Sequence, residues 1–265
     1  MRTIAIAGNH PRHFYLLNAL RESNFLDSII IEKRGAMLPE TPNITDKNDL
    51  KNWVKHFKNR EKFELPNFPV SNKLDKQEQL LLENINKSQR EIILFIKDQK
   101  PNVAIIFGVS IIKEPIFSQL PDIKINLHSG LLPEFKGSAG NFWPFYFLKP
   151  NYVGMTFHFL TSKLDAGEII HQSQPTLTYG EKIHEVSCNV MLLAFIDAIK
   201  ILESIKNKKD LNKVPQTRNG KLFKNTDFLP HHLRIIYDDY NDEIVDHFLD
   251  NKIQRSEPNF IKMIF

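Results

Sequence analysis

The chain has 265 residues, of which 42% are hydrophobic and 25% charged, and its formal net charge is +4. This length and composition are typical of one large globular domain, with or without an appendage, and the small net charge gives no nucleic-acid signal. No segment approaches the roughly 18 to 20 consecutive apolar residues that span a bilayer, so we expect no membrane insertion.

The N-terminus and the cysteine content indicate a cytoplasmic protein without a bound metal. The apolar run at the N-terminus is too short for a signal peptide. Cys188 is the single cysteine, which excludes an internal disulfide and a multi-cysteine zinc site. His10 and His13 are close in sequence, but no further spaced ligands accompany them, and we predict no metal site.

The chain begins with a strand–helix–strand pattern. An apolar run at residues 2–8 is followed by a helical rhythm at 11–23 and a β-branched run at 27–32. This order predicts a βαβ unit and therefore a parallel sheet. Residues 33–73 are rich in proline and polar residues, with a helix expected near 47–59, and we interpret them as an excursion from the core fold.

The middle of the chain supplies the rest of the sheet. A long amphipathic pattern at 73–100 predicts a helix with a break near Asn86. Buried strands are expected at 102–108 and 123–128 because both runs are continuously apolar. Two later runs alternate between polar and apolar residues, as antiparallel or edge strands do, at 152–160 and 167–174.

The C-terminal part has one clear helix and a shorter appendage. Residues 181–209 carry apolar positions spaced three and four apart, which predicts a long helix. Pro215 marks a linker, and a further helix is expected at 239–250. The fold predicted is α/β, with a Rossmann-like, mostly parallel sheet covered by helices on both faces. Its catalytic domain would span 1–209, with a C-terminal extension at 210–265.

Asn126 and His128 stand where the 123–128 strand ends. Ligands of open parallel sheets bind beyond the carboxyl ends of the strands, and residues two apart on a strand point to the same side. The spacing therefore aims an amide and an imidazole into one pocket, while Leu127 faces the core. An amide can stabilise a developing oxyanion, and an imidazole can handle a proton near neutral pH. Asp165, on a tight loop before a strand, is the expected third member.

These residues belong to a longer pattern that resembles the folate-dependent formyltransferase family, which includes the glycinamide ribonucleotide, methionyl-tRNA and sugar N-formyltransferases. The resemblance covers roughly residues 100–175, and its order and spacing make it specific. Ser129 is a departure, since many family members have proline after the histidine. The matching residues are Asn126 and His128; Leu132, Pro133 and Gly137; Gly154, Thr156 and His158; and Asp165, Gly167 and Ile169.

The resemblance implies formyl transfer from 10-formyltetrahydrofolate to an amine. Asn126 and His128 would then hold the formyl oxygen, and Asp165 would support His128 and help to remove a proton from the attacking nitrogen. His158 is interpreted as a packed or supporting residue. The resemblance also implies a pterin site, for which our candidates are Phe107, Gly108, Val109, Leu132, Gly137, Leu164 and Gly167.

Two places are candidates for binding the acceptor. The turn after the first strand opens a helix, which suits an anion, and Asn9, His10, Arg12 and His13 add donors there. An ordinary exposed helix start explains that turn equally well. Trp143 is most simply a core residue, and a stacking surface for a substrate ring is the alternative.

The organisation of the chain is similar to that of the sugar N-formyltransferases. This resemblance, which rests on the 33–73 excursion and the C-terminal extension, implies a nucleotide-linked amino sugar as the acceptor, for surface polysaccharide synthesis, and no nucleic acid. A small amine such as glycinamide ribonucleotide, a formyl-tetrahydrofolate hydrolase and a folate-sensing module remain alternatives. The apolar ending at 260–265 indicates packing against the body or against a second copy in a homodimer.

Overall fold

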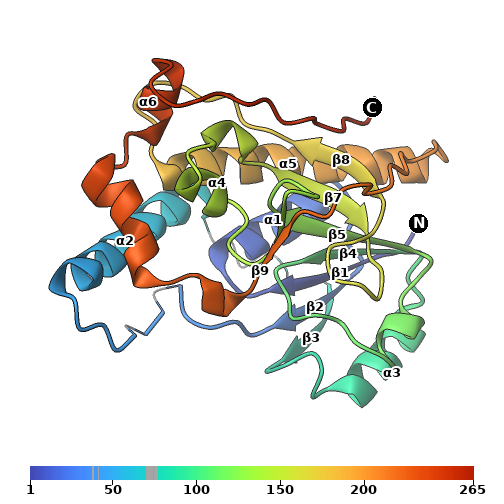
Figure 1. Ribbon diagram of the computed structural model, residues 1–265. Coiled ribbons are helices and arrows are strands. Elements are labelled where there is room, and N and C mark those ends of the chain that lie inside the picture. The colour runs from blue at the N-terminus through green and yellow to red at the C-terminus, as the bar shows by residue number, and fades with distance from the viewer. Residues whose placement is uncertain (38, 41, 70–73, 75–76) are drawn as a thin grey trace.

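The computed structural model describes residues 1–37, 39–40, 42–69, 74 and 77–265, and the rest of the predicted 33–73 excursion lies outside them. Seven strands form one sheet in the order β3-β2-β1-β4-β5-β7-β8 (Figure 1). The strands are β1 (Thr3–Gly8), β2 (Ser28–Glu32), β3 (Glu78–Leu82), β4 (Val103–Phe107), β5 (Ile123–Ser129), β7 (Met155–Phe159) and β8 (Ile169–Ser173).

The sheet is parallel from β3 to β5, and β7 and β8 are antiparallel. Every strand that the sequence predicted is present, and the two alternating runs are the antiparallel ones. The expected α/β architecture is therefore confirmed. The helices are α1 (Pro11–Glu22), α2 (Lys47–Asn67), α3 (Gln89–Gln99), α4 (Trp143–Tyr146), α5 (Ile183–Lys206) and α6 (Ile244–Leu249).

Alternate residues of the parallel strands face two separate layers of the core. On β1, Ala5 and Ala7 join the cluster that contains buried residues of α1, α2 and α5, whereas Ile4 and Ile6 join the cluster that contains α3. This is the two-residue period of a strand buried on both faces. Figure 1 shows α1 and α5 on one side of the sheet and α3 on the other.

The helix predicted from residue 73 onward is wrong over its first half. Residues 78–82 form β3, which pairs in parallel with β2 at the edge of the sheet. Leu82 is buried and Leu81 is 67% exposed, so the leucines alternate across the strand. Pairing with β2 outweighs the helix propensity of this leucine-rich run. The helix itself begins only at Gln89, just after the break expected near Asn86.

The helix of the 33–73 segment packs against the core, and the interpretation of the whole segment as an excursion stays a prediction. Its helix α2 connects β2 to β3 and packs against α5, and Trp53 and Phe68 belong to the larger core cluster. Pro66 lies within α2, whereas Pro39, Pro42 and Pro69 flank the helix. The helix is longer than the 47–59 range expected, ending at Asn67.

The C-terminal extension contacts the rest of the chain at several points along its length. Its strand β9 (Lys221–Phe223) pairs with β6 (Phe135–Gly137), next to the end of β5. Arg234 forms an ion pair with Asp49 of α2. The last residues run along the edge strand β8, where the Met263 amide donates to His171 (Figure 1). Within the described residues, no helix is both long and apolar enough to cross a bilayer.

Candidate active site

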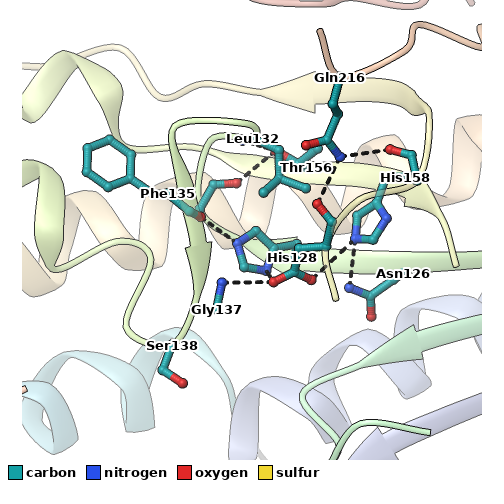
Figure 2. Close-up of polar contacts among 12 residues, drawn as sticks. Asn126, His128, Leu132, Phe135, Gly137, Ser138, Thr156, His158 and Gln216 are labelled. Atoms are coloured by element: carbon teal, nitrogen blue, oxygen red, sulfur yellow. Dashed lines mark hydrogen bonds and ion pairs between the residues drawn. The ribbon is translucent and has the colours of Figure 1, made fainter. Parts of the chain in front are cut away.

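The antiparallel pairing of β5 and β7 assembles the polar cluster at the end of β5. Asn126 lies directly opposite His158, and His128 opposite Thr156 (Figure 2). Leu127 between them is buried in the core, as predicted. Asp165 reaches the same place from the loop between β7 and β8. The three residues predicted to form the catalytic group are therefore brought together.

His128 is fixed by one hydrogen bond and faces Asp165 with its other nitrogen. Its Nε2 lies 2.8 Å from the Phe135 carbonyl oxygen, which can only accept, so the neutral ring carries its proton on Nε2. Nδ1 is then unprotonated and lies 3.6 Å from Oδ2 of Asp165. This arrangement allows His128 to take up a proton at Nδ1, beside a carboxylate that stabilises the resulting cation.

Burial and charge set the protonation of this pair. Burial lowers the pKa of His128, although the Asp165 charge and the Phe135 carbonyl oppose it. Burial would raise the pKa of Asp165, but His158, His128 and the Gly137 amide outweigh it and lower that pKa to about 2. At neutral pH the cluster therefore holds a neutral imidazole beside an ionised carboxylate.

His158 positions Asn126. Its Nδ1 donates to the Phe159 carbonyl at 3.0 Å, which leaves Nε2 as an acceptor for the Asn126 amide, also at 3.0 Å. An amide group has two N–H donors, so the second N–H of Asn126 remains available to the cavity. His158 is 1% exposed, which confirms it as a packed, supporting residue.

The backbone around Asp165 is held by contacts from several segments. Asp165 has a φ of +46°, and its Oδ2 accepts from the Gly137 amide at 2.8 Å. Gly137 has a φ of +85°, and a Cβ there would lie 2.1 Å from the Phe223 carbonyl oxygen, so the position requires glycine. Gln216 of the C-terminal extension donates to the carbonyls of Asp165 and Gly167 (Figure 2).

A cavity of about 720 Å³ opens beside this cluster and is lined by Asn126, His128 and Asp165. We call it the Asp165 cavity. Its walls come from the loop after β4, the end of β5, the β7–β8 loop and the end of β9. Of the residues predicted for the pterin site, it is lined by Phe107, Gly108, Val109, Gly137 and Leu164.

The two other pterin candidates support the wall instead of lining it. Leu132 is 1% exposed, and its backbone is bonded to the side chains of Thr156 and Gln172. Gly167 packs so closely on β7 that a Cβ would lie 1.7 Å from the Phe159 carbonyl oxygen. Both residues therefore keep the turns in place without facing the cavity.

A second cavity of about 400 Å³ shares a wall with the first. We call it the Arg60 cavity, after a residue of α2 that lines it. The two cavities have in common Phe107, Gly108, Ser129, Ser138 and Asn225. Ser129 directly follows His128, so the cluster of Asn126, His128 and Asp165 stands at the boundary between the two cavities.

Two arginines and one glutamate give the Arg60 cavity a formal charge of +1. Arg12 contacts both carboxylate oxygens of Glu64, at 2.9 and 2.7 Å, and Nε of Arg60 contacts Oε1 at 2.7 Å. Burial and the nearby Arg60 lower the pKa of Arg12 to about 10, and the guanidinium stays charged at neutral pH. Glu64 is 4% exposed and neutralises only one of the two cations.

Three buried histidines also line the Arg60 cavity. His13 accepts the His10 amide at Nδ1, so its Nε2 carries the proton, and that nitrogen has no hydrogen-bond partner within the described residues. Nε2 of His184 is likewise without one there, and burial lowers its pKa to about 3. His56 is bonded to Tyr237 of the C-terminal extension. Neutral, unpaired ring nitrogens in a cavity are sites for a polar ligand.

Only some of the substrate-binding residues predicted from the sequence line a cavity. Arg12 and His13 line the Arg60 cavity. Asn9 instead accepts the Arg34 amide, and His10 contacts the Gly35 carbonyl, outside both cavities. Trp143 is 3% exposed and stacks on Phe223, so the interpretation as a stacking surface is wrong and the core interpretation holds.

Sequence reasoning missed most of the Arg60 cavity. One signal was available: His56, Arg60 and Glu64 are spaced four apart and therefore lie on one face of α2. Nothing in the sequence related Phe228 or Gln216 to the strand-end motif. In the described parts of the chain, no group of three or more His, Cys, Asp and Glu side chains is placed to hold a metal ion.

The sequence profile of the formyl transferase family matches residues 44–192, more than half of the chain. This chain belongs to the formyl transferase family. The match begins just before α2 and ends within α5, so it includes the whole catalytic cluster. The family resemblance noted from the strand-end motif is confirmed.

The curated relatives include methionyl-tRNA formyltransferases. The protein from Flavobacterium psychrophilum is 24% identical over 131 residues, which are 49% of this chain and 41% of that protein. The protein from Chlorobium chlorochromatii is 29% identical over 107 residues, or 40% of this chain and 33% of that protein. The chain therefore spans less than half the length of these two relatives.

Solved structures share the fold at low identity. A 4-N formyltransferase from Francisella tularensis has a TM-score of 0.54 and 14% identity, covering 85% of this chain and 77% of that one. Phosphoribosylglycinamide formyltransferase from Anaplasma phagocytophilum has a TM-score of 0.56 and 17% identity, with coverages of 84% and 98%. The formyltransferase PseJ from Anoxybacillus kamchatkensis, in complex with UDP-4,6-dideoxy-4-formamido-L-AltNAc and tetrahydrofolate, has a TM-score of 0.50 and 19% identity, covering 91% and 95%.

Proposed function

We propose that this protein transfers a formyl group from 10-formyltetrahydrofolate to the primary amine of a nucleotide-linked amino sugar. The observation that carries the proposal is the position of Asn126, His128 and Asp165 at the boundary of two adjoining cavities. A transfer between two bound molecules needs such a boundary, because donor and acceptor must meet at one point without displacing each other.

The folate donor occupies the Asp165 cavity. Its lining combines apolar side chains, among them Ile106 and Val109, with the bent backbone of the β4 and β7–β8 loops. A flat heteroaromatic ring with several hydrogen-bonding edges suits such walls, since the apolar faces cover the ring and backbone groups meet its edges. The formyl group then lies next to Asn126.

Asn126 stabilises the tetrahedral intermediate. When the amine attacks the formyl carbon, the carbonyl oxygen gains negative charge, and the free N–H of the Asn126 amide donates to it. His158 holds the amide through its other N–H, so the donor is oriented before the reaction begins. Preorganised donors of this kind typically contribute about 2.7–4 kcal/mol to lowering the barrier.

His128 moves the proton of the attacking amine, and Asp165 stabilises the protonated ring. The attacking nitrogen becomes positively charged and releases its proton to Nδ1 of neutral His128, while ionised Asp165 stabilises the imidazolium. The same proton then passes to N10 of the folate as the bond between N10 and the formyl carbon breaks. Tetrahydrofolate and the formamide are the products, and no covalent enzyme intermediate is needed.

The Arg60 cavity receives the acceptor. Its residual positive charge and the Nε2 donor of His13 suit an anionic, hydroxyl-rich molecule. The half-buried rings of Phe57 and Phe228 provide apolar faces of the kind that sugars and bases stack on. PseJ, which shares the fold, was solved with a UDP-linked formamido sugar. Together these features support an amino-sugar nucleotide as the acceptor.

The test is mass spectrometry of a panel of amines incubated with the protein and 10-formyltetrahydrofolate. The panel holds several nucleotide-linked amino sugars, glycinamide ribonucleotide, methionyl-tRNA and a reaction without acceptor. We expect one amino-sugar nucleotide to gain a formyl group, with tetrahydrofolate released in equal amount. Formylation of glycinamide ribonucleotide or methionyl-tRNA alone would contradict the acceptor class, and formate release without an acceptor would contradict transfer itself.

A further inference from the structure

Asn141 carries a buried oxygen atom without a hydrogen-bond partner. Its amide nitrogen lies 3.8 Å from Sδ of Met155, a thioether that can accept but cannot donate. Its amide oxygen is bonded to no other group within the described residues. Asn141 is 7% exposed and lines the Arg60 cavity. A buried oxygen without a partner costs stability, so its place in the wall of a cavity indicates a bound group that would pair with it.

The chemistry of this oxygen is more restrictive than that of the other unpaired atoms in the cavity. Among the described residues that line it, His13 and His184 also have a buried nitrogen without a partner. A ring nitrogen can donate or accept, according to its tautomer, whereas an amide oxygen can only accept. The group that pairs with Asn141 must therefore be an N–H or O–H of the bound molecule.

Asn141 lies against the end of β5. Gly140 before it is packed so closely that a Cβ there would lie 1.7 Å from the Ser129 carbonyl oxygen. Met155, which contacts the Asn141 amide, is paired directly with Ser129 across β5 and β7. Because Ser129 follows His128, Asn141 and His128 belong to the same strand end.

The two side chains reach this strand end from opposite faces of the sheet. Met155 is buried in the core cluster that contains residues of α1, α2 and α5, which is the side of the Arg60 cavity. By the alternation of the strand, Asn126 and His128 face the other side, where they line the Asp165 cavity. A nitrogen atom at the boundary of the cavities would therefore have His128 on one side and Asn141 on the other.

A primary amine that attacks a formyl carbon has two hydrogens with different fates. In the tetrahedral intermediate the nitrogen is bonded to the formyl carbon, carries both hydrogens and is positively charged. One hydrogen leaves as a proton to Nδ1 of His128, and the other stays and becomes the N–H of the formamide. An acceptor for the retained hydrogen fixes the rotation of the amine, so that its lone pair points at the formyl carbon before the attack.

We propose that the amide oxygen of Asn141 accepts the retained N–H of the attacking amine and orients its lone pair. This inference rests on the proposed function, because it requires an amine acceptor in the Arg60 cavity. The hydrogen bond strengthens as the nitrogen becomes positively charged, so it lowers the barrier and raises kcat. A hydrogen bond to a charged group is typically worth a factor of about 10 to 150, and we expect a contribution of about 30-fold.

The experiment compares Asn141→Leu with the wild type, using the amine of the panel that the wild type formylates. Leucine has nearly the shape of asparagine but offers no acceptor. We expect kcat to fall about 30-fold and the KM for 10-formyltetrahydrofolate to stay unchanged. A fall in kcat of less than about threefold would overturn the inference, since it lies below the range of a charged hydrogen bond. A wild type that formylates no amine would instead contradict the proposed function.

The melting temperature separates this role from a structural one and needs no substrate. Leucine removes a buried unpaired oxygen and keeps apolar contact with Met155. We therefore expect the melting temperature of Asn141→Leu to equal or exceed that of the wild type. A side chain that only supported the cavity wall would lose stability together with activity, so a melting temperature lowered by several degrees would overturn the proposal.

Two further variants locate the effect. Asn141→Asp keeps an oxygen acceptor at the same place, and its kcat should exceed that of Asn141→Leu. The control is Asn151→Leu, outside both cavities, where the buried amide donates to the Ser256 carbonyl at 2.7 Å. It should show the opposite pattern, with a lowered melting temperature and an unchanged kcat. Equal losses of kcat in Asn141→Leu and Asn141→Asp, or in Asn141→Leu and Asn151→Leu, would overturn the assignment.

Discussion

The Asp165 cavity and the Arg60 cavity share a wall but are built differently. The chemically reactive lining of the first comes from residues 126–165, within one continuous motif of the sequence. The second shares part of this motif, at Ser129 and within residues 138–142, but draws the rest of its lining from the end of β4, the start of α1, α2, the start of α5 and the C-terminal extension. Under the proposed function, the reaction depends on a local motif, whereas acceptor choice depends on how distant segments pack together.

The largest effect is expected from Asp165→Asn. The substitution keeps the shape of the side chain but removes the charge that stabilises protonated His128. We expect kcat to fall by about 10³-fold with both KM values nearly unchanged, since general acid–base catalysis typically contributes 10²- to 10⁴-fold. Steady-state kinetics measures kcat and both KM values, and a fall in kcat of less than tenfold would contradict the role of the carboxylate.

Asn126→Ala removes the oxyanion donor and should lower kcat by about 10²- to 10³-fold. Asn126→Asp is the matched variant, because it keeps the size of the side chain but replaces the donor by an acceptor. We expect the kcat of Asn126→Asp to be no higher than that of Asn126→Ala. An Asp variant with near-normal turnover would show that Asn126 does not donate to the formyl oxygen.

Gly137→Ala disturbs the packing of the Asp165 cavity wall and leaves Asn126, His128 and Asp165 unchanged. Its Cβ would lie 2.1 Å from the Phe223 carbonyl oxygen at a positive φ, and we expect the free energy of unfolding to fall by about 2 kcal/mol. Gly35→Ala is the control, since no atom lies within 4 Å of the added Cβ. Denaturant unfolding measures the free energy of unfolding of both variants, and equal values would contradict the packing described at Gly137.

Phe228→Ala tests the other cavity. Phe228 packs edge-on against Phe142 and lines only the Arg60 cavity. We expect the KM for the acceptor to rise about tenfold, consistent with the loss of one aromatic contact surface, and the KM for the folate to stay unchanged. Leu229→Ala changes an exposed neighbour and should have no effect on either KM.

The pH dependence is the smallest effect near neutrality. The proposed catalytic form has neutral His128, whose pKa burial lowers from its usual value. Its protonation at acid pH removes the base, so kcat should be level near pH 7 and fall only as the pH drops through that lowered pKa. Asp165, with a pKa of about 2, stays ionised throughout this range. A kcat that rises on acidification would contradict a neutral His128.

The sequence predicted the fold and the proximity of Asn126, His128 and Asp165 because both depend on short-range patterns. Strand period, helix rhythm and the spacing of Asn126, His128 and Asp165 are all readable within a few tens of residues. The edge strand β3 was missed because its leucines favour a helix locally, and only pairing with β2 makes it a strand. For Trp143 a substrate surface stayed open beside the core interpretation, because exposure cannot be read from one aromatic residue.

The acceptor side was predicted poorly for a related reason. Arg12 and His13 were found from their place after β1, but Glu64, the partner of Arg12, lies on another element. Phe228 and Gln216 reach the site from a segment that has no motif of its own. The predicted boundary between a domain at 1–209 and an extension at 210–265 stays a prediction, while the contacts of the extension with both cavities tie it to the site.

The most direct test of the two-cavity account is to measure kcat and both KM values of Asp165→Asn and Phe228→Ala side by side, with the acceptor identified by mass spectrometry. The account predicts that Asp165→Asn loses kcat alone and that Phe228→Ala raises the acceptor KM alone. A Phe228→Ala enzyme with weakened folate binding, or an Asp165→Asn enzyme that still turns over at a near-normal rate, would contradict the division of chemistry and acceptor choice between the two cavities.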